Sequence, residues 1–412
     1  MINYILCFGV VSTSILIVKN LDKIKKIYTA LTLFSENNIV ENFRSIRSLG
    51  GPYRTAIHGN EAKFENAEIK YLPSTFIFKD KEYNLEKWLK LHWTTGLVVL
   101  KIEDVTKAKL VYEEYFLGNT FQTKTISWSI NKSVTSALIG IAIGEEKIKS
   151  VDDYVTDYVP SLKNSGYCQV KLKDALQMTS GISFDEDYSK PFSDINCMSY
   201  SLALGYNIDN CIASLRQQTR PGTKHNYVSS DTQVLAMVLK SVIGEQSLTS
   251  YLEEKLWKLG GFEADCDWLI DNEENQRELA FGTLNASTRD YARFGWLYLN
   301  KGLSPLDGKR LIDAKWIKDS ITCVDQDLLS EQHQKCGAGY GYQWWIPKSK
   351  RNDYLAIGVY GQFIYIDPKN NIVISKNSAD PNYNSYVDEH GVNVMELEAF
   401  EAFRAISDHY AK

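Results

Sequence analysis

A run of hydrophobic residues at positions 134–142 is the feature that most limits how this chain can fold. These residues are apolar or small and uncharged, so a helix formed here is too hydrophobic for a surface and has to lie in the core. A polar stretch at 118–125 comes before it, and Ser129-Ile130-Asn131-Lys132 stands between the two. The sequence therefore predicts a buried helix, with a serine and a lysine where a loop enters the core.

Ser129 and Lys132 are three residues apart, so on a helix they share one face. An uncharged lysine amine placed there can take the proton of the serine hydroxyl, which is how a serine nucleophile works without histidine. The alternative is an N-capping serine followed by a lysine in the first turn. A Ser-x-x-Lys is expected by chance in 412 residues, so the pair alone leaves both interpretations open.

Composition bounds the size and the class of the protein. A chain of 412 residues with 44% hydrophobic and 12% aromatic residues can bury one large domain or two. The net charge of -5 gives no basic surface for nucleic acid. The six histidines show no metal-binding spacing and the seven cysteines no Cys-x-x-Cys, so we expect neither metal nor cofactor. Cys323 and Cys336 could pair in an oxidising compartment; buried thiols are the alternative.

The first residues of the chain form a separate hydrophobic segment. From Tyr4 to Val18 the residues are apolar or small and uncharged, and lysines follow at positions 19, 23, 25 and 26. The segment is at the short limit for a membrane-spanning helix, and no cleavage site marks a removable signal peptide. We therefore expect residues 1–18 to be an uncleaved membrane anchor. The lysines would keep the following chain in the cytoplasm by the positive-inside rule.

The remaining chain divides into an extension and a larger domain. Residues 19–85 carry charge, a Gly50-Gly51-Pro52 break and no catalytic signal. In the domain, 86–412, two strand-rich zones are expected as hairpins, and a helical region at about 150–280 lies between them. The predicted strand pairs are 96–102 with 110–115, and 354–366 with 371–376 across a turn at 367–370.

Strands at both ends of a domain with helices between them have to build one sheet together. A terminal helix should cover this sheet, because apolar residues recur at three-residue spacing. They are Val394, Leu397, Phe400, Phe403 and Ile406.

A second group of polar residues lies about a hundred positions after Ser129. A Pro221-Gly222 turn leads to Tyr227, and a helical run at 232–243 follows. Tyr227 could be an ordinary core aromatic, as most of the 25 tyrosines must be. A phenol beside a lysine amine would have a lowered pKa. It could then act as a base toward the serine and as an acid toward a leaving group.

These motifs together resemble the penicillin-recognising serine hydrolases of the class C β-lactamase type. Within that group the chain is most similar to the branch of 6-aminohexanoate-dimer hydrolases and related carboxylesterases. The resemblance rests on Ser129-x-x-Lys132, Leu176–Gly181, Pro221-Gly222 and Tyr227-Val228-Ser229. Blocks at 184–188, 284–295, 340–345 and 358–362 agree in order and spacing, and they extend it over residues from about 90 to 410.

The resemblance implies an α+β fold of the β-lactamase and penicillin-binding-protein type. An antiparallel sheet flanked by helices is built from both ends of the domain, and the site lies in a cleft beside the helical insert. Ser129 would attack a carbonyl, and Lys132 and Tyr227 would move the proton. The backbone N–H groups of Ser129 and Gln362 would bind the oxyanion, and water would then release the acyl-enzyme. Wall-directed relatives work outside the cell, so the membrane side stays open.

One departure from the family concerns the substrate. Relatives usually carry a basic Lys-Thr-Gly motif on the strand beside the nucleophile, whereas this chain has Val359-Tyr360-Gly361. Only the glycine is kept, which allows close approach of the backbone. Loss of a charge-assisted contact of about 1.5 to 3 kcal/mol argues against β-lactams and for esters or small linear amides. β-Lactamases more often carry asparagine at the position of Ser229, which is a second reason to expect esters or linear amides instead of β-lactams.

Three further residues carry two interpretations each, and a fourth carries one. Tyr188 could donate a hydrogen bond to an amide leaving group or pack on the helical insert. Asn285 is either a cleft residue or a turn former, and Tyr360 faces either the pocket or the core. His225 is most simply a turn residue.

We expect a membrane-anchored serine hydrolase that acts on a small ester or amide, without nucleic acid as a partner. The alternatives are a D-amino-acid peptidase or β-lactamase acting on cell-wall-like substrates, and a non-catalytic wall-associated binding protein. The intact set of Ser129, Lys132 and Tyr227 disfavours the binding protein, which would not require all three.

Overall fold

The structure is a computed structural model, and it describes residues 31–44, 51–66, 71–188, 192–324, 337–388 and 392–411 and the single positions 24, 28, 29 and 190. The predicted anchor, residues 1–18, lies outside the described residues, as does Cys336. Within the described part of the chain, no helix combines the length and the hydrophobicity needed to span a bilayer.

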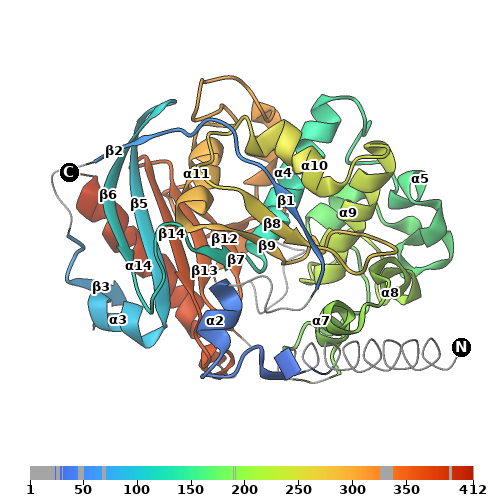
Figure 1. The fold of residues 1–412 in the computed structure, drawn as a ribbon, viewed down its shortest axis with the longest axis horizontal. Coiled ribbons are helices and arrows are strands. Elements are labelled where there is room, and N and C mark those ends of the chain that lie inside the picture. The colour runs from blue at the N-terminus through green and yellow to red at the C-terminus, as the bar shows by residue number, and fades with distance from the viewer. Residues whose placement is uncertain are drawn as a thin grey trace, which may run out of the picture.

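An eight-stranded sheet, counted over the described residues, forms the centre of the protein (Figure 1). β14 pairs with β5, so the two ends of the domain build one sheet, as predicted. The neighbouring strands are antiparallel except for β2, which runs parallel to β6. In sheet order the strands are β10 (Ala338–Tyr340), β11 (Trp345–Pro347), β12 (Tyr354–Gly358), β13 (Gln362–Asp367), β14 (Ile372–Ser378), β5 (Thr94–Asp104), β6 (Lys107–Tyr115) and β2 (Phe64–Asn66).

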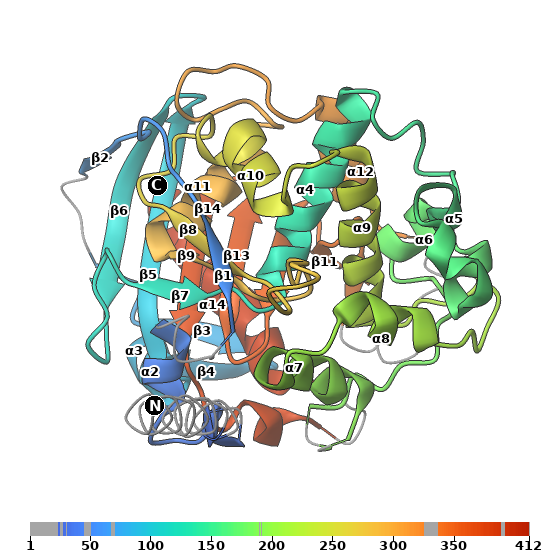
Figure 2. The same cartoon turned by 45° about the vertical axis from the view of Figure 1, so that its right-hand side comes forward.

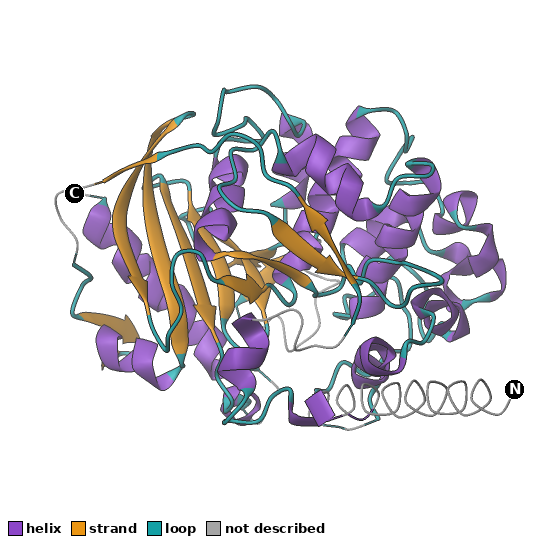
Figure 3. Cartoon of the chain, in the orientation of Figure 1, coloured by secondary structure: helices purple, strands orange, loops and turns teal. Residues whose placement is uncertain are grey.

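Helices cover both faces of this sheet (Figure 3). On one face, Gly295 of α11 (Thr288–Leu299) lies against side chains of β13 and β14. On the other face, Phe403 of α14 (Val394–Tyr410) meets Phe363 with 5.2 Å between ring centroids. Strands that are buried on both faces are hydrophobic at successive positions rather than at alternate ones. This explains the uninterrupted apolar runs by which both hairpins could be predicted.

The terminal helix buries only part of the predicted stripe. Phe400, Phe403 and Ile406 are buried, whereas Val394 and Leu397 are partly exposed. A strict three-residue spacing drifts around a helix with 3.6 residues per turn. The buried face therefore follows a mixture of three- and four-residue steps.

The predicted second hairpin is wrong in one respect. Residues 354–366 form two strands, β12 and β13, rather than one. The chain reverses at Tyr360 and Gly361, whose φ angles are 63° and 89°. A tight hairpin turn of this kind needs left-handed conformations at both central residues and usually carries Asn-Gly. Tyr-Gly does not give that signal, so the reversal could not be read from the sequence.

The helical region lies beside the sheet, and α4 lies where the two meet. Figure 2 shows this arrangement from a second side. The buried helix predicted after Ser129 is α4 (Ile130–Gly144), and it packs on α9 (Ser229–Val242). The other helical segments here are α5 (Val155–Tyr158), η2 (Pro160–Asn164), η3 (Gly166–Gln169), α6 (Leu172–Leu176), α7 (Asp194–Leu204), α8 (Ile208–Ser214), α10 (Leu248–Leu252), η4 (Glu253–Trp257) and α12 (Ala314–Ser320).

The residues predicted as an N-terminal extension contribute to several parts of the fold. A small second sheet has the order β1-β8-β9-β7, and its first strand comes from the extension. β2 closes one edge of the main sheet, and α2 (Ile39–Arg44) contacts β7. The bounds are β1 (Tyr53–Ala56), β8 (Cys266–Leu269), β9 (Leu284–Ser287) and β7 (Lys124–Ile126), with β3 (Thr75–Phe78), β4 (Lys81–Asn84) and α3 (Leu85–Leu91) forming a separate hairpin and helix.

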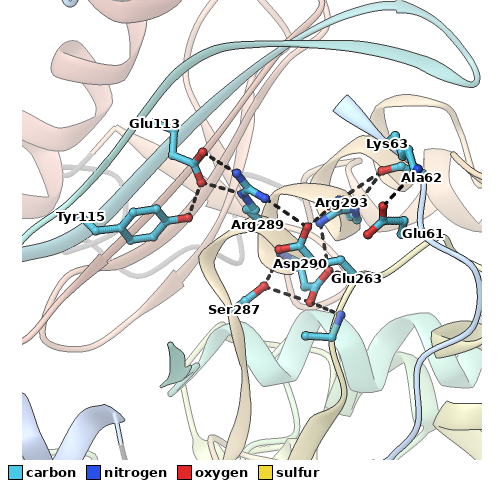
Figure 4. A network of polar contacts seen from close by, with 11 residues as sticks. Glu61, Ala62, Lys63, Glu113, Tyr115, Glu263, Ser287, Arg289, Asp290 and Arg293 are labelled. Carbon is cyan, nitrogen blue, oxygen red and sulfur yellow. Dashed lines mark hydrogen bonds and ion pairs between the residues drawn. The ribbon is translucent and has the colours of Figure 1, made fainter. Parts of the chain in front are cut away.

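A buried polar network ties the extension to α11 (Figure 4). The Arg293 guanidinium donates to the Ala62 carbonyl at 3.1 Å and to Glu263 at 2.9 Å. It also donates to Asp290 at 3.2 Å, and only 1% of Arg293 is exposed. Arg289 on the same helix pairs with Glu113 at 2.6 Å. These charges therefore fix the extension to the helix that supports the main sheet.

Candidate active site

Ser129 lies between β7 and α4, at the N-terminal end of the buried helix. It occupies the N-cap position, but its side chain makes no capping hydrogen bond. The structure therefore does not support the interpretation of Ser129 as a simple capping residue. The preceding residue, Trp128, has a φ of 43°, a left-handed conformation that is uncommon for a bulky side chain. The tight turn directs the serine hydroxyl away from the helix amides.

The amine of Lys132 is next to this hydroxyl. Lys132 Nζ lies 2.8 Å from Ser129 Oγ and donates to the Phe281 carbonyl at 2.7 Å. Burial lowers the pKa of Lys132 to about 8, although the negative charge of Glu186 acts against this shift. At pH 7 about a tenth of the amine is thus uncharged, far more than for an ordinary lysine, and this uncharged form is the proton acceptor that the serine requires.

Tyr227 completes the group that the sequence predicted. Lys132 Nζ lies 5.2 Å from the centroid of its ring, and Tyr227 lines the same cavity as Ser129. The predicted lowering of its pKa is wrong: burial and the charge of Glu186 raise the pKa of Tyr227 well above its usual value. Lys132 is itself largely uncharged when it acts as a base and then cannot stabilise a phenolate. Tyr227 is therefore a protonated phenol at neutral pH, and its predicted role in moving a proton stays a prediction.

These groups open into a cavity of about 460 Å³. Trp345 forms one wall and stacks on Tyr227 at 5.6 Å with 22° between the planes. The lining residues are Ser129, Glu186, Tyr188, Lys224, His225, Asn226, Tyr227, Trp345, Ile357, Val359, Tyr383 and Glu396. A larger cavity of about 860 Å³ lies elsewhere, beside α3 and β6. Neither Ser129 nor Lys132 lines that larger cavity.

The structure places two of the predicted substrate-binding residues behind the cavity wall. Ser229 is fully buried, and its backbone N–H and hydroxyl both donate to Glu186, at 2.8 and 2.5 Å. Asn285 is buried on β9 and donates to the Thr283 carbonyl at 2.9 Å. Ser229 therefore orients Glu186, which lines the cavity. The Asn285 side chain forms a local hydrogen bond next to its own strand.

The Tyr360 ring faces the core and not the pocket, which decides between its two interpretations. It is 2% exposed and stacks on Phe34 with 4.6 Å between centroids and 11° between planes. Gly361 lies beside it at the hairpin turn, where an added Cβ would meet Ser378 at 2.9 Å. The glycine nearest the nucleophile is instead Gly358, whose added Cβ would meet the Ser127 carbonyl at 2.5 Å. A side chain at 358 would thus displace the strand from the serine turn.

Gln362 faces Gly358 in the register of β12 and β13. Its side-chain amide donates to the Val359, Tyr360 and Ser378 carbonyls, at 3.4, 3.2 and 2.7 Å. This side chain therefore braces the turn at the cavity edge. The oxyanion role of its backbone N–H stays a prediction.

Tyr188, the remaining residue with two interpretations, lines the cavity and donates to Glu186 at 2.9 Å. His225 lines it as well, with its ring 5.3 Å from that of Tyr340. The prediction of His225 as a simple turn residue misses this wall position. Among the described residues, no group of histidine, cysteine and acidic side chains could hold a metal ion.

Among the cavity-wall residues that sequence reasoning did not assign to the site, four carry acidic or aromatic side chains. Glu186 lies within a block that the resemblance had identified, and so does Trp345. Tyr383 and Glu396 belong to the C-terminal segment and give no local signal, because only the fold brings them to Ser129.

Comparisons with known proteins agree with this geometry. The beta-lactamase family model matches residues 92–398. A 6-aminohexanoate-dimer hydrolase from Paenarthrobacter ureafaciens is 27% identical over 311 residues, covering 72% of this chain and 76% of that protein. The structure of a Bacillus anthracis protein provisionally named a 6-aminohexanoate-dimer hydrolase covers 92% of this chain and 95% of its own, at 22% identity and a TM-score of 0.77. A family VIII carboxylesterase structure covers 78% of this chain and 95% of its own, at 17% identity and a TM-score of 0.54. The resemblance predicted from the motifs is confirmed, and the chain belongs to the beta-lactamase family.

Proposed function

We propose that this protein is a serine hydrolase that cleaves small esters or linear amides through an acyl-enzyme on Ser129. The observation that carries the proposal is the 2.8 Å contact between Lys132 Nζ and Ser129 Oγ at the wall of a cavity. The lowered pKa of Lys132, about 8, makes its amine a base at physiological pH.

The geometry supports a sequence of proton transfers. Lys132 takes the hydroxyl proton as Ser129 Oγ attacks the substrate carbonyl, and a tetrahedral oxyanion forms. Tyr227 passes a proton to the leaving alcohol or amine as its bond to the acyl carbon breaks, and the proton held by Lys132 then returns to the Tyr227 oxygen, which leaves Lys132 uncharged again. Water attacks the acyl-enzyme while Lys132 takes one of its protons. As the acyl–serine bond breaks, that proton passes to Ser129 Oγ, and the carboxylic acid product leaves.

The charges on the cavity wall support esters or linear amides over β-lactams. A β-lactam antibiotic brings a carboxylate that its hydrolases pair with a cation. The β12–β13 hairpin supplies only Ile357 and Val359 to this cavity. Two acids, Glu186 and Glu396, line it, and the lysine in its lining, Lys224, is exposed and comes from another segment than the strand that carries the family's basic motif. The names of two similar proteins, a 6-aminohexanoate-dimer hydrolase and a family VIII carboxylesterase, also support linear amides or esters as substrates.

A comparison of four substrates tests the proposal. The full chain is assayed with p-nitrophenyl butyrate, butyryl p-nitroanilide, a chromogenic cephalosporin and a peptide that ends in D-Ala-D-Ala. We expect the highest kcat/KM for the ester or the anilide. A cephalosporin turned over as fast as the ester would favour the β-lactamase alternative, and cleavage of D-Ala-D-Ala peptides alone would favour the peptidase.

We also propose that residues 1–18 anchor the protein in a membrane, which rests on the apolar run from Tyr4 to Val18. Fractionation of cells that express the full chain, with a chain lacking residues 1–18 as control, tests this. Recovery of the full chain in the supernatant after ultracentrifugation would contradict it.

A further inference from the structure

Large apolar side chains are exposed on two segments that lie far apart in the sequence, residues 24–31 and the segment of α7 with its flanks. Their exposed fractions run from 41% to 88%. Groups of exposed large apolar side chains are uncommon on a soluble monomer and mark sites of association. We call this set the apolar surface, and its members are Ile24, Tyr28, Leu31, Phe192, Leu204 and Tyr206.

The first three members have the spacing of one helix face. Ile24, Tyr28 and Leu31 have helical backbone, and residues three and four positions apart on a helix are neighbours on its surface. Lysines stand around Ile24 at positions 19, 23, 25 and 26. An apolar helix face among lysines is typical of a helix that lies in the interface of a membrane with anionic lipids.

Both segments lie along the lower edge of the molecule in Figures 1 and 2, and both lead to the active-site cavity. Phe34 stacks on Tyr360 with 4.6 Å between centroids, and the Tyr360 ring lies 5.3 Å from that of Tyr383, which lines the cavity. Asn196 of α7 donates to the Tyr188 carbonyl at 3.1 Å, and Tyr188 lines the cavity as well. The apolar surface is therefore close to the cavity on two sides.

The chain that precedes this surface indicates what covers it. The proposed anchor ends at Val18, only a few residues before Ile24. An anchor in the bilayer would hold the apolar surface within reach of the lipid headgroups, where tyrosine rings such as those of Tyr28 and Tyr206 are favoured. A lipid surface accounts for the lysines as well as for the apolar side chains, because anionic headgroups attract a basic segment next to an anchor.

We propose that the apolar surface rests on a phospholipid membrane and holds the active-site cavity at the lipid–water interface. The proposal rests on the proposed anchor. It goes beyond the anchor because the folded domain itself, and not only residues 1–18, has to touch lipid.

Photo-cross-linking to lipid maps this contact in the full chain. The protein is reconstituted into vesicles of phosphatidylcholine and phosphatidylglycerol that contain a phosphatidylcholine with a diazirine close to its acyl carbonyl. Mass spectrometry then identifies the peptides that carry lipid. We expect adducts on residues 1–18, 24–34 and 192–206.

Tyr154 and Leu259 serve as exposed controls, since 45% and 46% of them is accessible. They flank α5 and the segment of α10 and η4, which lie away from the lower edge (Figure 1). Peptides that contain these two residues should carry no lipid.

Leu31→Asp combined with Phe192→Asp places charge in the apolar surface while the anchor stays intact. Adducts on 24–34 and 192–206, relative to those on 1–18, should fall by about tenfold or more, the scale of withdrawing two large apolar side chains from burial. Tyr154→Asp combined with Leu259→Asp is the matched control and should keep the wild-type pattern. All four positions are exposed, so the melting temperature should stay near that of wild type in both variants. The wild-type map itself depends on no variant.

The outcomes are distinguishable. Adducts confined to residues 1–18 would overturn this inference and leave the anchor intact, as would adducts that persist in Leu31→Asp with Phe192→Asp. Absence of adducts from every peptide would contradict the anchor and the inference together. Dimers of the detergent-solubilised wild type that this double variant abolishes, measured by sedimentation velocity, would assign the surface to a second copy of the chain and overturn the lipid partner. The proposed hydrolysis is measured separately with the neutral ester and does not enter any of these readouts.

Discussion

At the scale of single residues, the contact between Lys132 and Ser129 decides the chemistry. Burial lowers the pKa of Lys132 to about 8, so the amine is charged below that pH and uncharged above it. We therefore predict that kcat/KM for a neutral ester rises with pH to a plateau above about 8. Lys132→Ala should lower it by more than about 100-fold, the scale of general-base catalysis. Stopped-flow kinetics between pH 5 and 9.5 measure both, and a flat profile with an active Lys132→Ala variant would mean a different base.

The sequence predicted this residue set because local motifs carry it. Ser129 and Lys132 share one helix turn, and Tyr227 follows a Pro-Gly turn, so each has a short-range signal. The predicted direction of the Tyr227 pKa shift was wrong because burial cannot be read from a motif, and burial together with the charge of Glu186 raises this pKa. Glu396 and Tyr383 could not be predicted, because only the tertiary fold places α14 beside Ser129.

At the scale of elements, an aromatic cluster from the N-terminal extension holds both turns that flank the site. Phe34 stacks on Tyr360, and Phe43 on α2 meets Trp128 at 5.3 Å between centroids. Trp128 and Tyr360 both have positive φ angles, 43° and 63°, a strained conformation that persists only where packing enforces it. The cluster therefore fixes the serine turn against the facing strand.

We predict that Phe43→Ala lowers kcat for a small ester by about tenfold or more, since small misplacements of catalytic groups are costly, with a smaller effect on KM. Phe76→Ala is the matched control. Phe76 is equally buried in the same core layer but stacks on Tyr83, away from both turns. Both variants should lose several kcal/mol of stability, about 3 to 5 for a buried phenylalanine. Equal losses of kcat in the two variants, measured below both melting temperatures, would show a general packing effect instead.

Sequence prediction worked for elements with strong periodicity and failed where the chain turned without a turn signal. The buried helix α4, the β5–β6 hairpin and α9 lie where they were predicted, with ends that differ by up to four residues, because apolar runs specify the elements but not their exact ends. The reversal at Tyr360 was missed, and with it the core position of that ring. A left-handed tyrosine is stabilised by tertiary contacts with Phe34 and Trp128, which no local pattern records.

At the scale of the whole molecule, the two ends of the domain meet in one sheet, and the extension is fixed to it by buried charge. The predicted order of strands, helices and strands already required the shared sheet. The attachment of the extension could not be predicted, because Arg293 meets the Ala62 carbonyl across 231 positions of sequence.

We predict that Arg293→Ala destabilises the protein strongly, by about 3 to 5 kcal/mol, because it leaves Glu263 and Asp290 buried without their cation. Arg289→Ala is the matched control: its side chain is 23% accessible, against 2% for Arg293, so its loss should cost less. Thermal unfolding followed by circular dichroism compares the melting temperatures. Equal shifts for the two variants would show that the buried network does not fix the extension.

The central claim is that Ser129 is the covalent centre, and one measurement tests it directly. The full chain is incubated with an alkyl fluorophosphonate, and the intact mass and a peptide map are recorded for wild type and Ser129→Ala. Ser129 lies at a cavity wall and makes no capping bond, so removal of its hydroxyl should leave the fold and the melting temperature nearly unchanged. We predict a single adduct on Ser129 in wild type, and neither an adduct nor ester turnover in the variant. An adduct on another serine, or turnover that persists in Ser129→Ala, would contradict the account.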